Sequence, residues 1–161
     1  VLLNNKNLLI IFMKTLDFII PVFNEEENVP LLHQKINEFS KVYEGKIQIN
    51  IFFIDDGSTD NTFSKIIKMR EESNNIKIIK LTRNFGKENA LTAGLDFTDA
   101  DACIIFDADF QDPLTAAHEM IQKWNEGHDS IIGKRIDRSE DTFIKRFSSS
   151  LFYKFHNSVQ K

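Results

Sequence analysis

The sequence predicts an α/β fold in which a mostly parallel sheet is flanked by helices. Segments typical of strands alternate with segments typical of amphipathic helices along the chain. Strands that are separated by helices of about ten residues or more imply βαβ units and parallel pairing. Two of the strand segments, 51–54 and 102–106, are continuously apolar, which is typical of strands covered on both faces. The length of 161 residues suits a single domain.

The first half of the chain predicts two strands, each followed by a helix. Residues 17–22 form a short β-rich run that stops at Asn24. Apolar residues at helical spacing follow over 29–43. The run 47–54 is β-branched and aromatic and ends at an Asp-Asp-Gly-Ser turn, after which helical spacing returns over 62–70.

The second half continues the alternation. Its β-rich runs predict strands at 76–81, 102–106 and 130–132. Its apolar and alanine residues predict helices over 87–97 and 114–124. A proline immediately before the second of these helices suits a first helical turn.

Composition excludes several classes of protein. The formal net charge of −4, from 20 basic and 24 acidic residues, excludes a globally basic nucleic-acid-binding protein. Apolar residues make up 42% of the chain and charged residues 27%, as in globular proteins. The single cysteine, Cys103, excludes an internal disulfide and is expected in the core among its apolar neighbours. The four histidines lack zinc spacing and are expected at the surface, with His33 a minor site candidate.

Several nucleotide and hydrolase motifs are missing from the sequence. No Gly-x-Gly-x-x-Gly follows the first strand, and Gly86-Lys87 is followed by Glu88 in place of the Ser or Thr of a phosphate-binding Walker loop. No Gly-x-Ser-x-Gly turn is present. The sequence therefore excludes a dinucleotide fingerprint, a Walker loop and a nucleophile elbow.

Polar motifs follow each of the first four predicted strands, at 24–25, 55–58, 83–86 and 107–109. Each of them alone is equally compatible with an ordinary turn or helix cap. In an open α/β sheet the carboxyl ends of the strands form the ligand-binding edge, so four such motifs together predict one composite site. Asp107 and Asp109, two residues apart, can share a Mg²⁺ or Mn²⁺ ion; the alternative is that they are exposed turn residues.

Taken in order, these motifs resemble those of family 2 glycosyltransferases with the GT-A fold, a Rossmann-like nucleotide-diphospho-sugar transferase architecture. The resemblance covers about residues 16–156. The segments that carry it are 20–26, 54–62, 83–87, 91–96, 107–113, 133–135 and 145–146. The Asn-Phe-Gly-Lys and Asp-Ala-Asp-Phe-Gln-Asp-Pro segments are most similar to the polyprenyl-phosphate hexosyltransferase branch, which includes dolichyl-phosphate mannose synthases and bactoprenol glucosyltransferases.

For the nucleotide part of the donor, the resemblance implies four contact residues. The Pro-x-x-Asn-Glu turn of the family lines the base and ribose pocket, which points to Pro21, Phe23 and Glu25. Tyr is common at the position of Phe23, so a hydroxyl contact is lost there while stacking is retained. The first Asp of the Asp-Asp-Gly-Ser turn, Asp55, is implied to contact the base or ribose.

For the diphosphate and the metal, the resemblance implies five residues. Asp107 and Asp109 take the metal, and through it the donor diphosphate, with Ala108 lining the same turn. Gln111 lies near the metal and phosphates and is a further metal ligand. Arg135 pairs with donor phosphate, a role that suits its bidentate guanidinium. The catalytic roles are therefore implied for Asp107, Asp109 and Arg135.

The implied reaction is metal-dependent, inverting transfer of a hexose from UDP-glucose or GDP-mannose to a polyprenyl phosphate, with Mg²⁺ or Mn²⁺ as cofactor. A phosphate acceptor is largely dianionic at pH 7 and needs no general base. Two alternatives stay open. One is a family 2 transferase that acts on a saccharide or glycolipid hydroxyl in cell-surface polysaccharide synthesis; the other is a truncated remnant that binds nucleotide sugar without turnover.

The ends of the chain suggest where the natural domain begins and stops. Met13 precedes the first convincing strand, so residues 1–12 are expected to be an extension and 13–161 a single GT-A domain whose C-terminal part is missing. An aromatic stripe beside basic residues over 143–155 is typical of an interfacial membrane helix, or equally of a helix that packs on its own domain. The expected location is the cytoplasm, at the inner face of the membrane in the full-length protein.

Overall fold

The computed structural model describes residues 13–108 and 114–133. The elements are β1 (Lys14–Val22), α2 (Asn28–Ser40), a 3-10 turn η1 (Lys41–Tyr43), β2 (Ile47–Asp55), α3 (Thr62–Glu72), β3 (Ile76–Lys80), α4 (Lys87–Phe97), β4 (Ala102–Ile105) and α5 (Leu114–Asn125). The four predicted helices and the first four predicted strands are confirmed. The strand expected at 130–132 is wrong: these residues have no regular structure, and Ile132 is 89% exposed.

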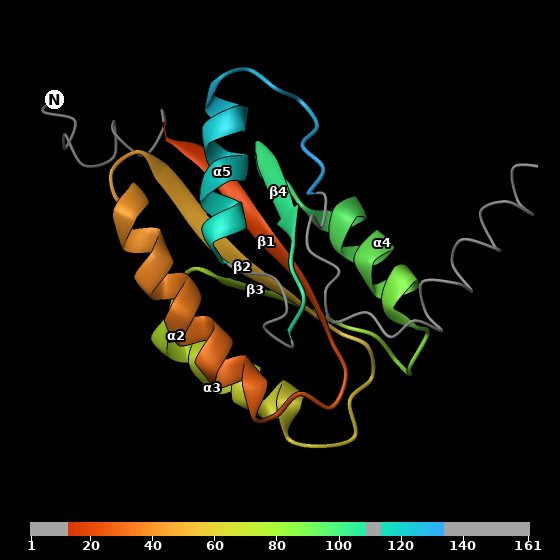
Figure 1. Ribbon diagram of the computed structural model, residues 1–161. Helices are drawn as coiled ribbons and strands as arrows, with labels where there is room; N and C mark the ends of the chain where they lie inside the picture. The colour runs from red at the N-terminus through yellow and green to blue at the C-terminus, as the bar shows by residue number, and fades with distance from the viewer. Residues whose placement is uncertain (1–12, 109–113, 134–161) are drawn as a thin grey trace, which may run out of the picture. The chain divides into compact units, whose positions relative to one another are not determined.

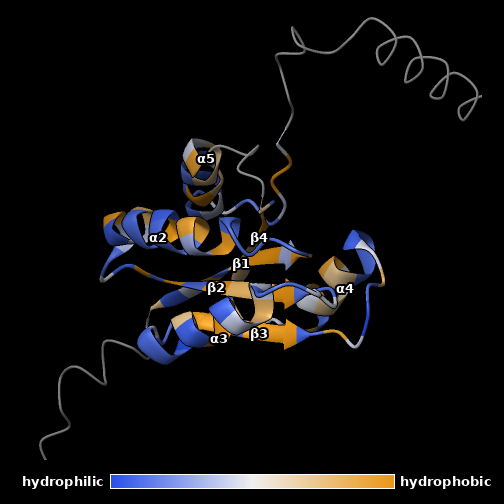
Figure 2. Ribbon diagram, turned by 90° about the horizontal axis from the view of Figure 1, so that it is seen from below, coloured by the Kyte–Doolittle hydropathy of each residue, from blue (hydrophilic) through white to orange (hydrophobic). Residues whose placement is uncertain are grey.

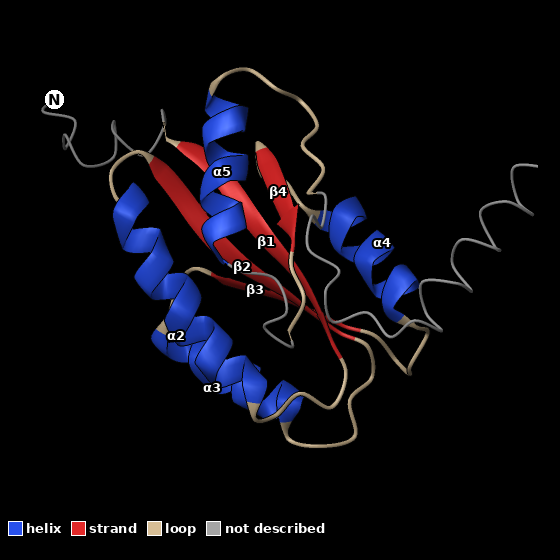
Figure 3. Ribbon diagram, in the orientation of Figure 1, coloured by secondary structure: helices blue, strands red, loops and turns tan. Residues whose placement is uncertain are grey.

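The four strands form one parallel sheet in the order β3-β2-β1-β4. The strand order reverses beside β1, because β2 and β3 extend to one side of it and β4 lies on the other. Figure 1 and Figure 3 show α4 apart from α2 and α3 across this sheet. In such folds a ligand cleft is expected at the carboxyl ends of the strands, where the order reverses.

The central strand β1 is buried on both faces because its alternate side chains meet different helices. Phe18 packs edge to face against Phe39 of α2, with ring centroids 5.6 Å apart. Ile19 points to the other face and packs with Ala90 of α4. Gly94 of α4 comes so close that a Cβ there would lie 2.6 Å from the Ile19 side chain. Figure 2 shows hydrophobic residues gathered along the strands.

The edge strand β4 departs from the prediction. Residues 102–106 were expected to be covered on both faces, and Cys103 was expected in the core. Within the described part of the chain, Ile104 and Phe106 are buried, whereas Cys103 is exposed and Ile105 is 48% exposed. β4 pairs only with β1 among the described strands, so it is an edge strand of the described sheet.

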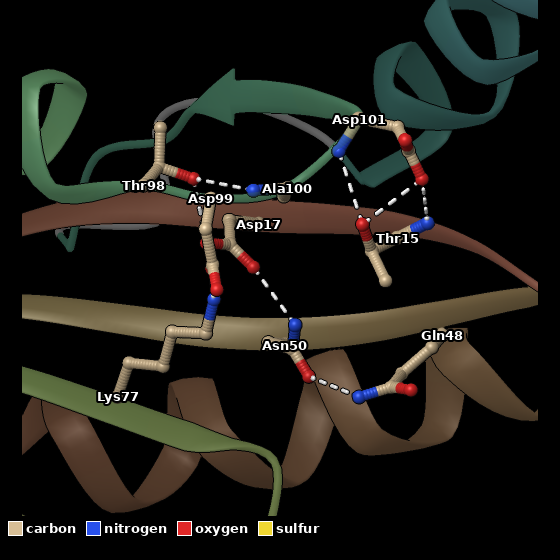
Figure 4. A network of polar contacts seen from close by, with 9 residues as sticks. All are labelled: Thr15, Asp17, Gln48, Asn50, Lys77, Thr98, Asp99, Ala100 and Asp101. Carbon is tan, nitrogen blue, oxygen red and sulfur yellow. Dashed lines mark hydrogen bonds and ion pairs between the residues drawn. The ribbon is translucent and has the colours of Figure 1, made fainter. Parts of the chain in front are cut away.

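A buried carboxylate, Asp17 of β1, ties β2, β3 and the α4–β4 loop together near the amino ends of the strands (Figure 4). Its Oδ1 accepts a hydrogen bond from Asn50 Nδ2 at 2.8 Å. Its Oδ2 accepts from Lys77 Nζ at 3.0 Å and from Thr98 Oγ1 at 2.7 Å. Lys77 also pairs with Asp99. We call these five residues the Asp17 network.

Within the Asp17 network, the pKa values of Lys77 and Asp99 are shifted by their hydrogen bonds and charges. Burial alone would lower the pKa of Lys77, but hydrogen bonds to Asp99 and Asp17 and their charges outweigh it, so the pKa is raised. The same hydrogen bond and charge from Lys77 lower the pKa of Asp99. Asp17 itself is 0% exposed, and both of its oxygens have donors, as a buried carboxylate requires.

The chain divides into two compact units, residues 1–122 and 123–161. The described part of the second unit contains the end of α5 and the irregular segment that follows it. Lys123 pairs there with Glu126 at 2.7 Å. Among the described residues, no helix combines the length and the apolar character needed to cross a membrane.

Candidate functional site

A cleft of about 300 Å³ lies at the carboxyl ends of β1 and β4, where the strand order reverses. We call it the β1–β4 cleft. Its lining residues are Pro21, Val22, Phe23, Glu25, Asp56, Asn84, Gly86, Lys87, Asp107 and Ala108. They come from the ends of β1 and β4, from the β2–α3 turn and from the β3–α4 connection, so motifs far apart in the sequence meet at one edge, as the fold requires.

The β1–β4 cleft brings together some, but not all, of the predicted site residues. Pro21, Phe23, Glu25, Asp107 and Ala108 all line it. Their individual roles stay predictions.

Of the remaining predicted site residues, one is described but is not a lining residue, and three lie outside the described residues. Asp55 is not among the lining residues, although its chain neighbour Asp56 is. Asp109, Gln111 and Arg135 lie outside the described residues, as does the proposed membrane segment 143–155.

Asp55, the last residue of β2, has an unusual hydrogen-bonding state. It is 0% exposed, and its Oδ1 accepts the backbone N–H of Ser58 at 3.0 Å. Its Oδ2 is buried and has no hydrogen-bond partner in the described part of the chain. An unsatisfied buried polar atom costs about 1–3 kcal/mol, so a donor from a bound ligand would relieve a standing penalty here.

Asp56 was not singled out as a site residue by the sequence, yet it organises one wall of the cleft. It is 3% exposed. Its two oxygens accept the backbone N–H groups of Phe85 at 2.8 Å and of Gly86 at 2.9 Å. The carboxylate therefore holds the β3–α4 connection against the β2–α3 turn.

Gly57 permits this close approach of the two loops. Its φ of +74° is in the left-handed region, and a Cβ on it would lie 2.7 Å from Arg83 Cα and 2.8 Å from Asn84 N. Glycine is the residue that tolerates both conditions. Asp56 and Gly57 together thus hold the β3–α4 connection, which leads directly into α4, in its place.

Lys87, the first residue of α4, also went unrecognised as a site residue. Its Nζ lies 2.6 Å from Asp107 Oδ1 and 2.7 Å from Oδ2. The two side chains remain 53% and 32% exposed. The available sequence signal was the Asn-Phe-Gly-Lys segment after a strand, which contributed to the family resemblance but implied no contact for Lys87.

The β1–α2 loop is held in place by side-chain contacts that leave Phe23 accessible. Asn24 adopts a φ of +54°, and its Oδ1 accepts the backbone N–H of Thr59 at 2.8 Å. The backbone N–H of Glu25 donates to Thr62 Oγ1 at 2.8 Å. Phe23 stays 40% exposed at the cleft, so its ring offers a face on which a planar base can stack.

The described residues include one of the predicted metal ligands, Asp107. Among them no group of three or more His, Cys, Asp or Glu side chains is placed to hold a metal ion. Asp107, at the cleft, offers a hard carboxylate ligand of the kind that Mg²⁺ and Mn²⁺ prefer. Its chemistry fits one ligand of the predicted pair, and the second, Asp109, lies outside the described residues.

None of the three described histidines lines the cleft, and two of them are less exposed than expected. His33 is half-buried on α2 beside Asn37 Nδ2, at 2.8 Å, and burial lowers its pKa. His118 is hydrogen-bonded to the Tyr43 hydroxyl at 2.7 Å. Its ring centroid lies 4.4 Å from that of Phe39, so it contributes to packing between α2 and α5.

Comparison with known sequences assigns a family to this arrangement. The family model described as "Glycosyl transferase family 2" matches residues 17–161. The bactoprenol glucosyl transferase of Shigella phage SfX is 43% identical over 144 residues, which are 89% of this chain and 47% of the phage protein. The prophage bactoprenol glucosyl transferase homolog of Escherichia coli strain K12 is 41% identical over 89% of this chain and 46% of its own. The chain thus spans about half the length of the curated relatives it matches.

Solved structures show the same fold. S. aureus TarS 1–349 in complex with UDP-GlcNAc matches with a TM-score of 0.58 at 21% identity, over 79% of this chain and 38% of that one. The mannosyltransferase PcManGT from Pyrobaculum calidifontis, in complex with GDP-Man and Mn²⁺, matches with a TM-score of 0.55 at 23% identity, over 81% and 37%. The predicted GT-A fold is therefore confirmed.

Proposed function

Because the chain belongs to glycosyl transferase family 2, we propose that it is the donor-binding part of an enzyme that transfers a hexose from a nucleotide sugar to a polyprenyl phosphate with inversion. The observation that carries the proposal is the β1–β4 cleft, which joins the Asp107–Lys87 pair to an exposed aromatic ring at the switch point of the sheet. The names of the relatives, bactoprenol glucosyl transferases, favour glucose as the sugar and a lipid phosphate as the acceptor.

The nucleoside end of the donor is assigned to the β1 and β2 ends of the cleft. Phe23 would stack on the base, and Pro21 and Glu25 would border the ribose. Asp55 Oδ2 would accept an N–H from the base or a hydroxyl from the ribose, since it is a buried acceptor without a donor in the described structure. A charged acceptor that gains a hydrogen bond contributes about 1.5–3 kcal/mol.

The diphosphate end is assigned to Asp107 and Lys87, with Ala108 between Asp107 and the second proposed carboxylate. Asp107 and Asp109 would hold Mg²⁺ or Mn²⁺, with Gln111 as a further ligand. When bound, that cation neutralises charge on the departing diphosphate and templates its position. Arg135 would contribute a bidentate contact to donor phosphate. Reaction would occur at the cytoplasmic face of the membrane, with 143–155 as a proposed peripheral contact.

Donor binding and acceptor choice can be measured separately. Calorimetry with UDP and GDP in the presence of Mn²⁺ should show binding, and Asp107→Asn should weaken the Mn²⁺-dependent part while leaving uridine or guanosine binding nearly unchanged. Asp55→Ala should weaken nucleoside binding even without metal. Equal effects of the two variants on nucleoside binding would refute this division of roles.

Transfer assays then decide among the reactions. Labelled UDP-glucose or GDP-mannose is offered with a polyprenyl phosphate, a saccharide or a glycolipid as acceptor. Label on the lipid phosphate supports the proposal. Label only on a hydroxyl acceptor supports the polysaccharide alternative, and nucleotide binding without any transfer supports the non-catalytic one.

A further inference from the structure

We propose that Lys87 is an exchangeable counter-ion of the donor site. It pairs with Asp107 in the absence of donor, and it moves to the donor diphosphate when Asp107 binds a divalent cation. The inference rests on the function proposed above and adds a residue that determines how metal and donor binding depend on each other. Four features of the described residues support it.

The first feature is the geometry of the ion pair. Lys87 Nζ lies 2.6 and 2.7 Å from the two oxygens of Asp107, so the ammonium engages the whole carboxylate. A Mg²⁺ ion requires the same oxygens at about 2.0–2.1 Å. Two cations at one carboxylate repel each other, so a metal on Asp107 weakens the hold of Asp107 on the ammonium. Metal binding and this ion pair therefore compete for the same two oxygens.

The second feature is the position of Lys87 on its helix. Lys87 is the first residue of α4, at the positive end of the helix dipole, where a cation is unfavourable and an anion is favoured. The ammonium thus needs a negative partner at this place. Asp107 is that partner in the described structure, and a diphosphate in the same cleft can replace it.

The third feature is that the backbone under Lys87 is fixed while its side chain is accessible. Asp56 holds the N–H groups of Phe85 and Gly86, and Asn89 Nδ2 donates to the Phe85 carbonyl at 2.7 Å. The Lys87 side chain is 53% exposed and has a flexible four-carbon stem. Exchange of partners therefore requires only side-chain rotation.

The fourth feature is the charge of the cleft. Its described lining contains three carboxylates, from Glu25, Asp56 and Asp107, and one ammonium, from Lys87. A diphosphate that enters such a lining is repelled unless cationic groups face it. Lys87 consequently opposes metal binding in the absence of donor and favours donor binding in the presence of metal, and by linkage each of these ligands then strengthens the other.

The test compares Lys87→Met with Lys123→Met. Lys123 also forms a close ion pair, with Glu126 at 2.7 Å, but it does not line the cleft, so its variant controls for loss of one surface charge. Mn²⁺ affinity without nucleotide is measured by electron paramagnetic resonance, and UDP and GDP affinity at saturating Mn²⁺ by calorimetry. Circular dichroism and thermal unfolding verify that each variant is folded.

We expect Lys87→Met to bind Mn²⁺ alone about threefold to tenfold more tightly and the Mn²⁺-bound nucleotide about tenfold more weakly, since one competing and one attractive charge are lost. Lys123→Met should match the parent in both measurements, and Lys87→Arg should retain nucleotide binding because it keeps the charge. Opposite changes in Mn²⁺ affinity and in nucleotide affinity distinguish the proposed role of Lys87, since a purely structural role would weaken both affinities or neither.

Two failures are distinguishable. If the parent binds neither UDP nor GDP with Mn²⁺, the proposed function is wrong and this inference is wrong with it. If the parent binds nucleotide but Lys87→Met leaves either affinity as in Lys123→Met, or shifts both in the same direction, only the role of Lys87 is overturned.

Discussion

The Asp17 network and the β1–β4 cleft are two groups of charged residues on one sheet, and they differ in how fully their oxygens are hydrogen-bonded. Asp17 is 0% exposed, and three donors occupy its two oxygens. Asp55 is equally buried, but its Oδ2 has no donor in the described part of the chain. At the cleft itself, Asp107 forms an accessible ion pair with Lys87.

The difference separates a carboxylate whose hydrogen bonds are complete within the fold from two that can still accept a donor or a cation from the ligand proposed above. A buried charge is tolerable when its partners are complete, and removal of such a charge disrupts them all. A buried oxygen without a donor stores a cost that a ligand can relieve. Substitutions of the same chemical kind in the two regions should therefore have opposite consequences for stability and for binding.

The largest effect is expected from Asp17→Asn. The amide presents an N–H₂ group toward donors that now bind a carboxylate oxygen, and Lys77 and Thr98 lose their shared acceptor. The free energy of unfolding should fall by about 2–4 kcal/mol, measured by urea denaturation, while the folded variant binds nucleotide as the parent does. Asp96→Asn, at an exposed position on α4, removes the same charge and is the control. Equal stability of the two variants would contradict a structural role for the Asp17 network.

Gly57→Ala should lower the free energy of unfolding by a smaller amount, about 2–3 kcal/mol. The new Cβ would collide with the Arg83 backbone, and residue 57 has a φ of +74°, which alanine adopts only with strain. The displaced β3–α4 connection should also weaken nucleotide binding. Gly45→Ala is a matched control, since Gly45 has a φ of +76° but nothing within 4 Å of its Cβ position. It should cost about 1–2 kcal/mol through φ alone and leave binding unchanged. A nucleotide affinity that stays at the parent value in Gly57→Ala would show that this loop contact does not shape the cleft.

Asp55→Asn should have the opposite effects to Asp17→Asn: nucleoside binding should weaken while stability is nearly unchanged. The Ser58 N–H keeps an acceptor, and the other atom loses no hydrogen bond because Asp55 Oδ2 has none in the described structure. The free energy of unfolding should stay within about 1 kcal/mol of the parent, while nucleoside affinity falls about tenfold, or about 1.4 kcal/mol, because the acceptor is replaced by a donor. Urea denaturation and calorimetry with uridine or guanosine provide the two values. A stability loss as large as that of Asp17→Asn would remove the distinction between the regions.

The smallest effect concerns acid stability near the Asp17 network. The backbone N–H and hydroxyl of Thr15 donate to Asp101 and lower the pKa of its carboxyl below the ordinary aspartate value of 3.8. A lowered folded-state pKa contributes stability that is present above the unfolded value and is lost as pH falls through the folded value. Asp101→Asn should therefore lose less stability than the parent as pH falls below 3.8, measured by thermal unfolding across pH. Superimposable pH profiles would show that these hydrogen bonds do not contribute.

Much of the fold followed from the sequence because its determinants are local. Apolar residues at helical spacing and β-branched runs placed four helices and four strands. The prediction of a strand at 130–132 failed because a run with two β-branched residues, Ile131 and Ile132, is too short to form a strand unless another strand offers it hydrogen bonds. The prediction that β4 is covered on both faces failed because an apolar run shows that a segment is hydrophobic but not what packs against each of its faces. Ile105 of β4 is 48% exposed.

The candidate site was predictable to the extent that it follows from the ends of strands. Alternation of strands and helices sets parallel pairing, so the sequence alone determined that Phe23, Glu25 and Asp107 would share one edge. Only the tertiary structure distinguished Asp55 from Asp56, paired Lys87 with Asp107, and enclosed Asp17 among Asn50, Lys77 and Thr98. Those outcomes depend on strand order and on how closely two loops approach at Gly57. The physical reason is that a side chain's partners are set by long-range packing, whereas its periodicity is set by its neighbours in the chain.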